Sequence, residues 1–368
     1  MPNIKWMRVI FFSVPYSIFT AFGLAYSGAH GQTSAEMSRA LHLPRSPVEI
    51  GPAFSALSST LNEEAYGDST TIANSLWVQR GFNLSPSFIQ LAKHDFNADL
   101  QLEDFTRDTS IACRDVNRWV AQATNGRITN IMSPEKLSAV MRLVLCNAIY
   151  FRDRWAHPFP LAATSQAPFH LASGQEVLVS MMHVEGSYPM IHFDDFTLFE
   201  MGYQRGCSMV ALLPDAVDGL SKLESKVSVS SLSGWLNAPT TEPWWKAIRV
   251  SFPRFSFSET MTFPDLPMTK QMPDVFDQKS ADFAGISESG GIWISELLHK
   301  AWIKVDEEGT EAAAVTTLEF NGAGLPRPSD RVFVADHPFL FVIRNDRTGL
   351  ILFMGRVLNP NSNTCGTP

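Results

Sequence analysis

A run of small residues leading into a loop is the part of this sequence best suited to a chemical role. After Gly309, the residues from Thr310 to Thr317 are small or β-branched apart from Glu311, and residues 321–328 are typical of turns and loops. With a period of two, one face of this arm carries Thr310, Ala312, Ala314, Thr316, Leu318 and Phe320. Such an arm could slip between two packed strands without clashes. An Ala-rich helical turn followed by a surface loop is the alternative.

Residue groups that would indicate an enzyme or a metal protein are absent from the sequence. There is no G-x-S-x-G nucleophile elbow and no glycine loop of the phosphate-binding kind. The cysteines form no C-x-x-C pair, and no His/Cys spacing suits zinc. They are Cys113, Cys146, Cys207 and Cys365. We therefore expect no enzyme activity, no metal and no cofactor.

Composition predicts one large globular domain covering residues 1–368. The chain has 45% hydrophobic residues, enough for a large core, and no Pro/Gly/Ser-rich linker divides it. A net charge of -8 argues against nucleic acid as a partner, because nucleic-acid binders usually carry a basic patch. We expect no membrane partner either.

The N-terminal 29 residues allow two interpretations. Lys5 and Arg8 precede a long apolar run, as in a secretory signal peptide. Alternatively, the run is a buried helix that has Pro15 in its first turn and ends at Gly28. The second interpretation fits the family resemblance described below.

Periodicity predicts an α+β fold in which most helices come early in the chain. Helical patterns cover 34–62 and 86–121. The apolar run 137–151 suits a central strand covered on both faces. Further strands are predicted at 70–79, 199–214, 248–261 and 293–309, with a hairpin over 331–360 that turns at Asn345–Gly349.

Five blocks of sequence, in order, resemble the serpins. The segment 306–316 (DEEGTEAAAVT) is similar to the reactive-loop hinge of inhibitory members, and 299–309 to the strand before it. The C-terminal signature is matched by 335–360 (ADHPFLFVIRNDRTGLILFMGRVLNP). The other two blocks are 147–159 (NAIYFRDRWAHPF) and 14–37, which is similar to the second helix of the fold.

The resemblance implies a serpin fold, with three β-sheets, about eight helices and an exposed reactive-centre loop at about 307–330. It implies an inhibitor of serine and, as a second option, cysteine proteases that is cut and then changes shape. The protease attacks the loop and forms an acyl-enzyme, and the freed arm inserts as a new central strand. The 14 positions from Gly309 to Ala323 would carry the protease on the order of 45 Å.

The resemblance also assigns roles to individual residues. The hinge comprises Glu307, Gly309, Thr310, Glu311, Ala312, Ala313 and Ala314. The breach, at the top of the central sheet, comprises Trp155, Arg254 and Glu307, with an ion pair between the last two. The shutter, beneath the sheet, comprises Ser13, Ser17, Asn147 and His299, with His299 bonded to Asn147 and no metal.

The loop length usual in the family, counted from the hinge, implies a reactive bond at Ala323–Gly324, with Gly322, Gly324 and Leu325 as alternatives for the cleaved residue. The small Ala323 side chain favours an elastase-like or subtilisin-like protease. The helix near 52–64, which corresponds to the heparin-binding helix of relatives, has no Lys or Arg. We therefore expect no activation by heparin.

Two features depart from the family pattern. Only about ten residues precede Phe11 where serpins have a long first helix, so we expect this sequence to lack that helix. We expect the full-length chain to be a monomer. Val14 interrupts the usual Ser-Pro-aromatic-Ser motif. A non-inhibitory serpin acting as chaperone or carrier is the alternative function. An extracellular location is expected, with a cytoplasmic one as the alternative.

Overall fold

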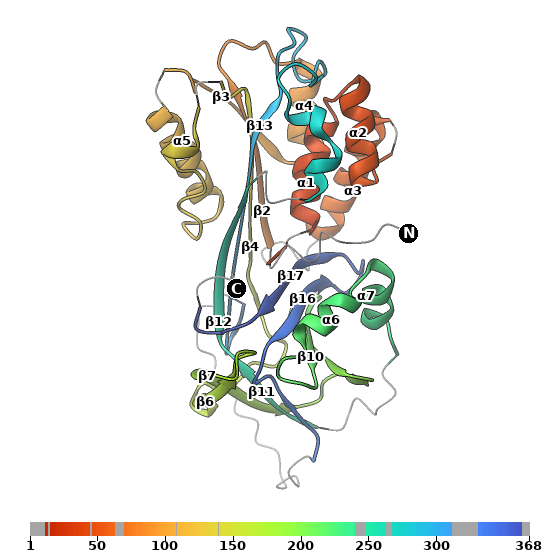
Figure 1. Cartoon of the computed structure of the whole chain (residues 1–368), viewed down its shortest axis with the longest axis vertical. Coiled ribbons are helices and arrows are strands. Elements are labelled where there is room, and N and C mark those ends of the chain that lie inside the picture. Colours follow the sequence, from red (N-terminus) through yellow and green to blue (C-terminus); the bar gives the residue numbers. More distant parts are fainter. Residues whose placement is uncertain are drawn as a thin grey trace. The chain divides into compact units, whose positions relative to one another are not determined.

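The structure is a computed structural model of the chain that describes residues 12–13, 15–44, 46–62, 70–107, 109–138, 140–239, 247–262, 267–310 and 330–362. These residues form an α+β fold with three β-sheets, which confirms the expected fold class (Figure 1). The α-helices within these ranges are α1 (Pro15–Tyr26), α2 (Gly31–Leu41), α3 (Ile50–Asn62), α4 (Pro86–Asp95), α5 (Thr109–Ala123), α6 (Leu220–Lys226) and α7 (Val229–Leu236).

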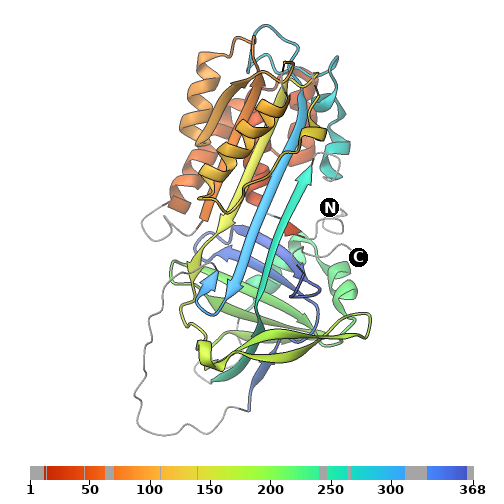
Figure 2. The same cartoon turned by 90° about the vertical axis from the view of Figure 1, so that its left-hand side faces the viewer.

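The largest sheet has the order β3-β2-β4-β13-β14-β5, and β12 pairs with β13. Its strands are β2 (Thr70–Gln79), β3 (Ala98–Glu103), β4 (Leu143–Phe151), β5 (Asp153–Arg154), β12 (Phe255–Thr262), β13 (Ile294–Asp306) and β14 (Gly309–Thr310). Figure 2 shows β4, β13 and β12 running side by side. Every residue of β4 is buried, Asn147 included, as the largely apolar run over 137–151 predicts.

The two remaining sheets are smaller. A six-stranded sheet has the order β1-β17-β16-β10-β9-β8, and a four-stranded sheet has the order β15-β11-β7-β6. The first contains β1 (Phe12–Ser13), β8 (Met190–Phe193), β9 (Phe196–Gly202), β10 (Cys207–Pro214), β16 (Phe339–Asn345) and β17 (Ile351–Val357). The second contains β6 (Ser165–His170), β7 (Glu176–Gly186), β11 (Ile248–Pro253) and β15 (Val332–Val334).

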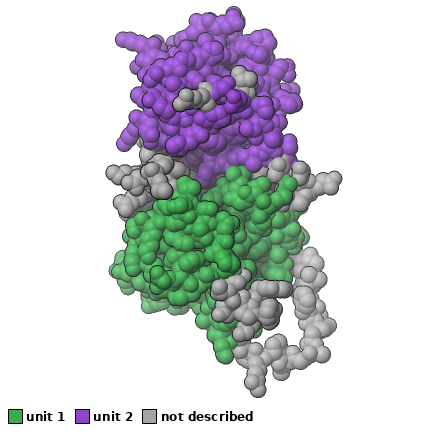
Figure 3. Space-filling view, turned by 90° about the vertical axis from the view of Figure 1, so that its right-hand side faces the viewer, with its two compact units in different colours: residues 1–13, 151–258, 303–368 green, residues 14–150, 259–302 purple. Residues whose placement is uncertain are grey.

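The contacts divide the chain into two compact units, each built from separate chain segments (Figure 3). Unit 1 contains residues 1–13, 151–258 and 303–368, and unit 2 contains 14–150 and 259–302. In unit 1, aromatic rings fill the core between the two smaller sheets, as in the stack of Phe199 on Phe333 at 4.1 Å. In unit 2, α5 packs on the large sheet through an apolar cluster that includes Val116, Val120 and Leu298.

Helix α1 accounts for the apolar N-terminal run. Its residues Phe22, Leu24 and Tyr26 are completely buried, and Tyr26 donates a hydrogen bond to the carbonyl of Pro44 at 2.5 Å. Pro15 is the first residue of α1, as predicted. The described part of the run is therefore core of the fold. No helix among the described residues is long and apolar enough to cross a membrane.

Three sequence-based assignments need correction. The helical pattern over 86–121 contains a strand, β3, whose Leu, Gln and Glu residues favour a helix but whose backbone pairs in parallel with β2. The strand pattern over 248–261 divides at Arg254 into β11 and β12, which belong to different sheets. The hairpin predicted over 331–360 contains only β16 and β17, because β15 pairs with β11.

Candidate functional site

On one side, the central strand β13 has two different neighbours along its length, and β12 also pairs with it. From Ile294 to Trp302 it pairs in parallel with β4, and the last pair is Trp302 with Tyr150. At Val305 and Asp306 it pairs instead with the short strand β14, in antiparallel register. On its other side β14 pairs with β5. Gly309 and Thr310, two of the predicted hinge residues, therefore form a strand inside the large sheet.

Thr310 is anchored in this position. It is completely buried, and its hydroxyl lies 2.7 Å from the hydroxyl of Tyr203, within hydrogen-bond distance. Sequence reasoning missed Tyr203, because nothing near position 203 indicates a partner more than one hundred residues away. A small side chain with one hydrogen-bonding group suits this site, and a larger one would not fit without displacing its neighbours.

Gly309 cannot be replaced without strain. Its φ of +148° is a conformation that residues with a side chain rarely adopt. A Cβ at this position would lie 2.2 Å from the carbonyl oxygen of Asp153 and 2.7 Å from the Cα of Arg154. Both atoms belong to the backbone of β5, so they cannot simply turn away. The glycine allows β14 to approach β5 closely enough to pair with it.

Trp155 binds the turn that leads into β14. Its indole Nε1 donates to the carbonyl of Asp306 at 2.9 Å, and its backbone N–H donates to Glu308 at 3.0 Å. The ring is 1% exposed and stacks on Tyr203 with centroids 4.3 Å apart. Trp155 is thus bonded to the turn that leads into β14 and packed against the partner of Thr310.

Arg254 and Glu307 form the ion pair that the resemblance implied. Arg254 donates through Nε at 2.7 Å and through Nη2 to one carboxylate oxygen of Glu307, which also accepts from the hydroxyl of Thr164. Burial opposes ionisation of Glu307, but these hydrogen bonds outweigh it and lower the pKa of the carboxyl group. The pair ties the junction of β11 and β12 to the residue that begins the turn before β14.

Asp153 is a buried carboxylate on β5. It is 5% exposed, stands opposite Thr310 in the β5–β14 pairing, and accepts hydrogen bonds from the backbone N–H groups of Arg154 at 2.8 Å and Arg205 at 3.2 Å. Burial is the largest cause of its shift and raises the pKa of Asp153 to about 6.

The raised pKa of Asp153 predicts a contribution to the unfolding free energy that depends on pH. Between the unfolded-state pKa near 3.9 and about 6, the folded protein binds more protons than the unfolded chain, so this contribution decreases as pH rises. We expect Asp153→Asn to remove it. The measurement is the difference in unfolding free energy between wild type and variant from pH 4.5 to 7.5. A difference that stays constant over this range would contradict the assignment.

A second polar network connects four elements of unit 2. Asn147 on β4 accepts at Oδ1 from the hydroxyl of Ser17 on α1 at 2.6 Å and from Nδ1 of His299 on β13 at 2.5 Å. Its Nδ2 donates to Asn74 on β2 at 2.6 Å and to the Ser17 carbonyl at 3.2 Å. Because Oδ1 can only accept, the proton of the His299 ring lies on Nδ1. Asn74 is a member that the sequence did not indicate.

His299 is completely buried, and burial lowers its pKa to about 3. The ring is therefore neutral at physiological pH. His299 and Asn147 are paired residues of the β4–β13 ladder, so their side-chain bond joins the two strands at a position where the backbones also pair. Any separation of β4 from β13 must break this bond.

Asn147→Ala should weaken the protein strongly, since it leaves buried polar groups of Ser17, Asn74 and His299 without their partner. A loss of about 3 kcal/mol in unfolding free energy is expected. Urea unfolding measures it, with Asn83→Ala as the control because Asn83 lies exposed in the loop before α4. Equal unfolding midpoints for the two variants would show that the network does not stabilise the fold.

For several predicted site residues, the side chain or the whole residue lies outside the described residues. Ser13 is in β1, where its backbone pairs with Met354, but its side chain lies outside the described residues. Its place in the Asn147 network stays a prediction. The same holds for the rest of the hinge and the reactive bond, which are Glu311, Ala312, Ala313, Ala314, Ala323 and Gly324. No group of three or more metal-ligating residues occurs in the described part of the chain.

Comparison with known proteins agrees with this arrangement of strands. The family model described as serpin, or serine protease inhibitor, matches residues 7–360. This chain belongs to the serpin family. As a serpin it is a member of a protease-inhibitor family and not an enzyme. An uncharacterized serpin-like protein of Thermococcus kodakarensis is 37% identical over 95% of this chain and 80% of its own length.

A sequence relative and a solved structure are also similar to this serpin. The leukocyte elastase inhibitor of Bos taurus is 34% identical, over 95% of this chain and 93% of its own length. Among solved structures, Serpin48 of the insect Tenebrio molitor superposes with a TM-score of 0.82 at 30% identity, covering 95% of this chain and 92% of its own. The match in sequence and structure thus extends over nearly the whole chain.

Proposed function

We propose that this serpin is a suicide inhibitor of serine proteases, which traps the acyl-enzyme by inserting its cut reactive loop into the large sheet. The observation that carries the proposal is β14. Two residues of the hinge already pair with β13 and β5 as a strand. Further insertion would extend this strand along β13, in the place that β4 occupies from Ile294 to Trp302.

The residues around β14 suit the start of such a movement. Gly309 permits the close approach to β5, and Thr310 fills a small buried site beside Tyr203. We propose that Trp155, Arg254 and Glu307 hold the turn while the loop is intact. The bond between Asn147 and His299 would then resist opening of the sheet, until the inserting strand separates β4 from β13.

Insertion supplies the free energy for trapping. Each new ladder hydrogen bond contributes about 0.5–1.5 kcal/mol, so a dozen bonds with apolar burial give more than about 10 kcal/mol. That is enough to distort the oxyanion hole of a covalently attached protease and stop deacylation. We assign the cleaved bond to Ala323–Gly324 and the target to an elastase-like or subtilisin-like protease. Relatives at 33–34% identity that carry the name leukocyte elastase inhibitor support this choice.

The test is to mix the protein with pancreatic elastase, subtilisin and trypsin and to look for complexes that survive SDS. We expect a stable complex with elastase or subtilisin, and a released C-terminal fragment whose mass places the cut after Ala323. Cleavage by every protease without a stable complex would favour the non-inhibitory alternative, a chaperone or carrier. An extracellular location is proposed as well, and fractionation of the source cells decides between it and the cytoplasm.

A further inference from the structure

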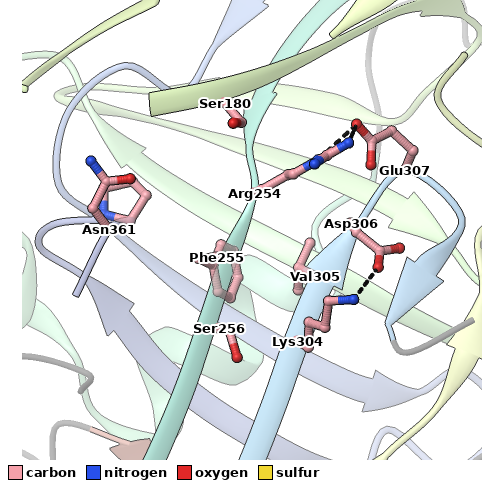
Figure 4. A pocket seen from close by; sticks show the side chains of 10 residues that line it. Ser180, Arg254, Phe255, Ser256, Lys304, Val305, Asp306, Glu307 and Asn361 are labelled. Carbon is pink, nitrogen blue, oxygen red and sulfur yellow. Dashed lines mark hydrogen bonds and ion pairs between the residues drawn. The ribbon is translucent and has the colours of Figure 1, made fainter. Parts of the chain in front are cut away.

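A pocket of about 340 Å³ lies in unit 1 beside the residues that lead into β14 (Figure 4). It is formed where the end of β13, the junction of β11 and β12, strand β7 and the C-terminal turn meet. Its lining residues are Ser180, Arg254, Phe255, Ser256, Lys304, Val305, Asp306, Glu307, Pro360 and Asn361. Its volume is that of a site for a small organic molecule.

The charged groups of this pocket are not equivalent. The carboxylates are the buried members, with side chains 6% exposed for Glu307 and 15% for Asp306, and both already accept hydrogen bonds. The cations are the exposed members, at 38% for Arg254 and 50% for Lys304. A guanidinium has five N–H donors and an ammonium three, more than these pairs use. The pocket therefore presents positively charged hydrogen-bond donors, those of Arg254 and Lys304, to solvent.

The neutral lining determines what kind of anion fits. Phe255, Val305 and Pro360 are apolar and buried, with Phe255 3% and Val305 1% exposed, so a small part of each forms the pocket wall. Figure 4 shows polar side chains around Phe255 and Val305. A hydrated inorganic anion would gain nothing from such a surface, whereas an aromatic or aliphatic group would be removed from water by it. A carboxylate on the same molecule would match the planar guanidinium of Arg254 and the ammonium of Lys304.

We propose that this pocket binds a small organic carboxylate, with its charged end at Arg254 and Lys304 and its apolar end against Phe255, Val305 and Pro360. Such a ligand would compete with Glu307 for Arg254 and so loosen the tie between Arg254 and the turn before β14. Because Gly309 and Thr310 follow that turn directly, occupancy of the pocket would change the rate at which the hinge moves. This second step rests on the proposed inhibitory function, but binding itself does not.

Binding is tested with phenylacetate, phenylacetamide and acetate as probes, by saturation-transfer NMR and calorimetry on the whole chain. Phenylacetate should bind, phenylacetamide at least about fivefold more weakly because it lacks the charge, and acetate at least about fivefold more weakly because it lacks the ring. Equal binding of phenylacetate and phenylacetamide, or no binding of phenylacetate at 20 mM, would overturn the proposal.

Variants locate the site. Lys304→Met should weaken phenylacetate binding at least about fivefold, and Lys304→Arg should preserve it. Lys222→Met is the matched control, since Lys222 is an exposed lysine paired with Asp195 on another part of unit 1. Thermal melting of each variant shows whether it is folded. Unchanged affinity in a folded Lys304→Met variant would place the ligand elsewhere and refute the assignment.

The regulatory step has its own measurement, the rate constant for protease inhibition with and without saturating phenylacetate. We expect at least a twofold change in the wild type and none in Lys304→Met. Binding with an unchanged rate would refute the link to the hinge. If the chain inhibits no protease, the proposed function fails while the binding experiment still decides whether the pocket is a carboxylate site.

Discussion

Under the proposed mechanism, Thr310→Glu should convert this serpin from an inhibitor into a substrate. The side chain at position 310 is completely buried beside Tyr203, and Asp153 stands opposite it on β5. A second carboxylate there would be desolvated next to a like charge, which costs several kcal/mol. This cost would displace β14 from the sheet, so that insertion has to bury the charge again and becomes slow relative to deacylation. The fraction of protease held in SDS-stable complexes should fall at least about tenfold, while the loop is still cut.

Thr310→Ser is the matched control, because it keeps the hydroxyl that faces Tyr203 and should trap protease at wild-type stoichiometry. Thr310→Arg is a weaker test, since the guanidinium could pair with Asp153 on the neighbouring strand. If Thr310→Glu still traps protease as efficiently as the wild type, insertion of the hinge at β14 is not the mechanism of this protein.

Cleavage of the loop within 318–325 should raise the melting temperature by more than about 20 °C. In the intact protein β14 has only two residues, and the cut frees the arm to extend it along β13. The added hydrogen bonds and buried apolar surface contribute more than about 10 kcal/mol, and each kcal/mol shifts the melting temperature by about 2 °C in a protein of this size. Scanning calorimetry of intact and cleaved protein gives the difference.

The control is Thr310→Glu cut at the same bond, which should gain much less, because a buried carboxylate at position 310 would displace β14 from the sheet and leave the arm no strand to extend. Equal melting curves for intact and cleaved wild type would mean that the cut arm stays outside the sheet. In that case the non-inhibitory alternative becomes the better description. A large rise in both proteins would show that stabilisation does not depend on β14.

Local sequence determined a large part of this fold. The strand pattern in 70–79 predicts β2 with its observed bounds, and the largely apolar run ending at Phe151 predicts a covered central strand, β4. Pro15 marks the first residue of α1. Asn345–Gly349 forms the turn between β16 and β17, with the N–H of Gly349 donating to the carbonyl of Asn345. These features depend on backbone preferences and on side-chain periodicity within a single segment, so they are visible without tertiary contacts.

Pairing between distant segments was decided only in the tertiary structure. Residues 98–103 have the composition of a helix, and they form β3 because β2 offers its backbone alongside. The change of sheet at Arg254 follows from which strands β11 and β12 each pair with. A single-segment pattern contains no information about such partners.

The sequence by itself determined which kind of protein this is, through the hinge and C-terminal blocks, and it pointed to Arg254–Glu307 and Asn147–His299 as pairs. Only the tertiary structure decided what surrounds them. Thr164 bonds to Glu307, and Asn74 bonds to Asn147. Tyr203 bonds to Thr310, and Asp153 stands opposite Thr310 in the β5–β14 pairing. Each of these neighbours comes from a separate element that tertiary packing brings to its partner. The physical reason is that a buried polar group must find its partner in space, and the nearest partner in space is rarely the nearest in sequence.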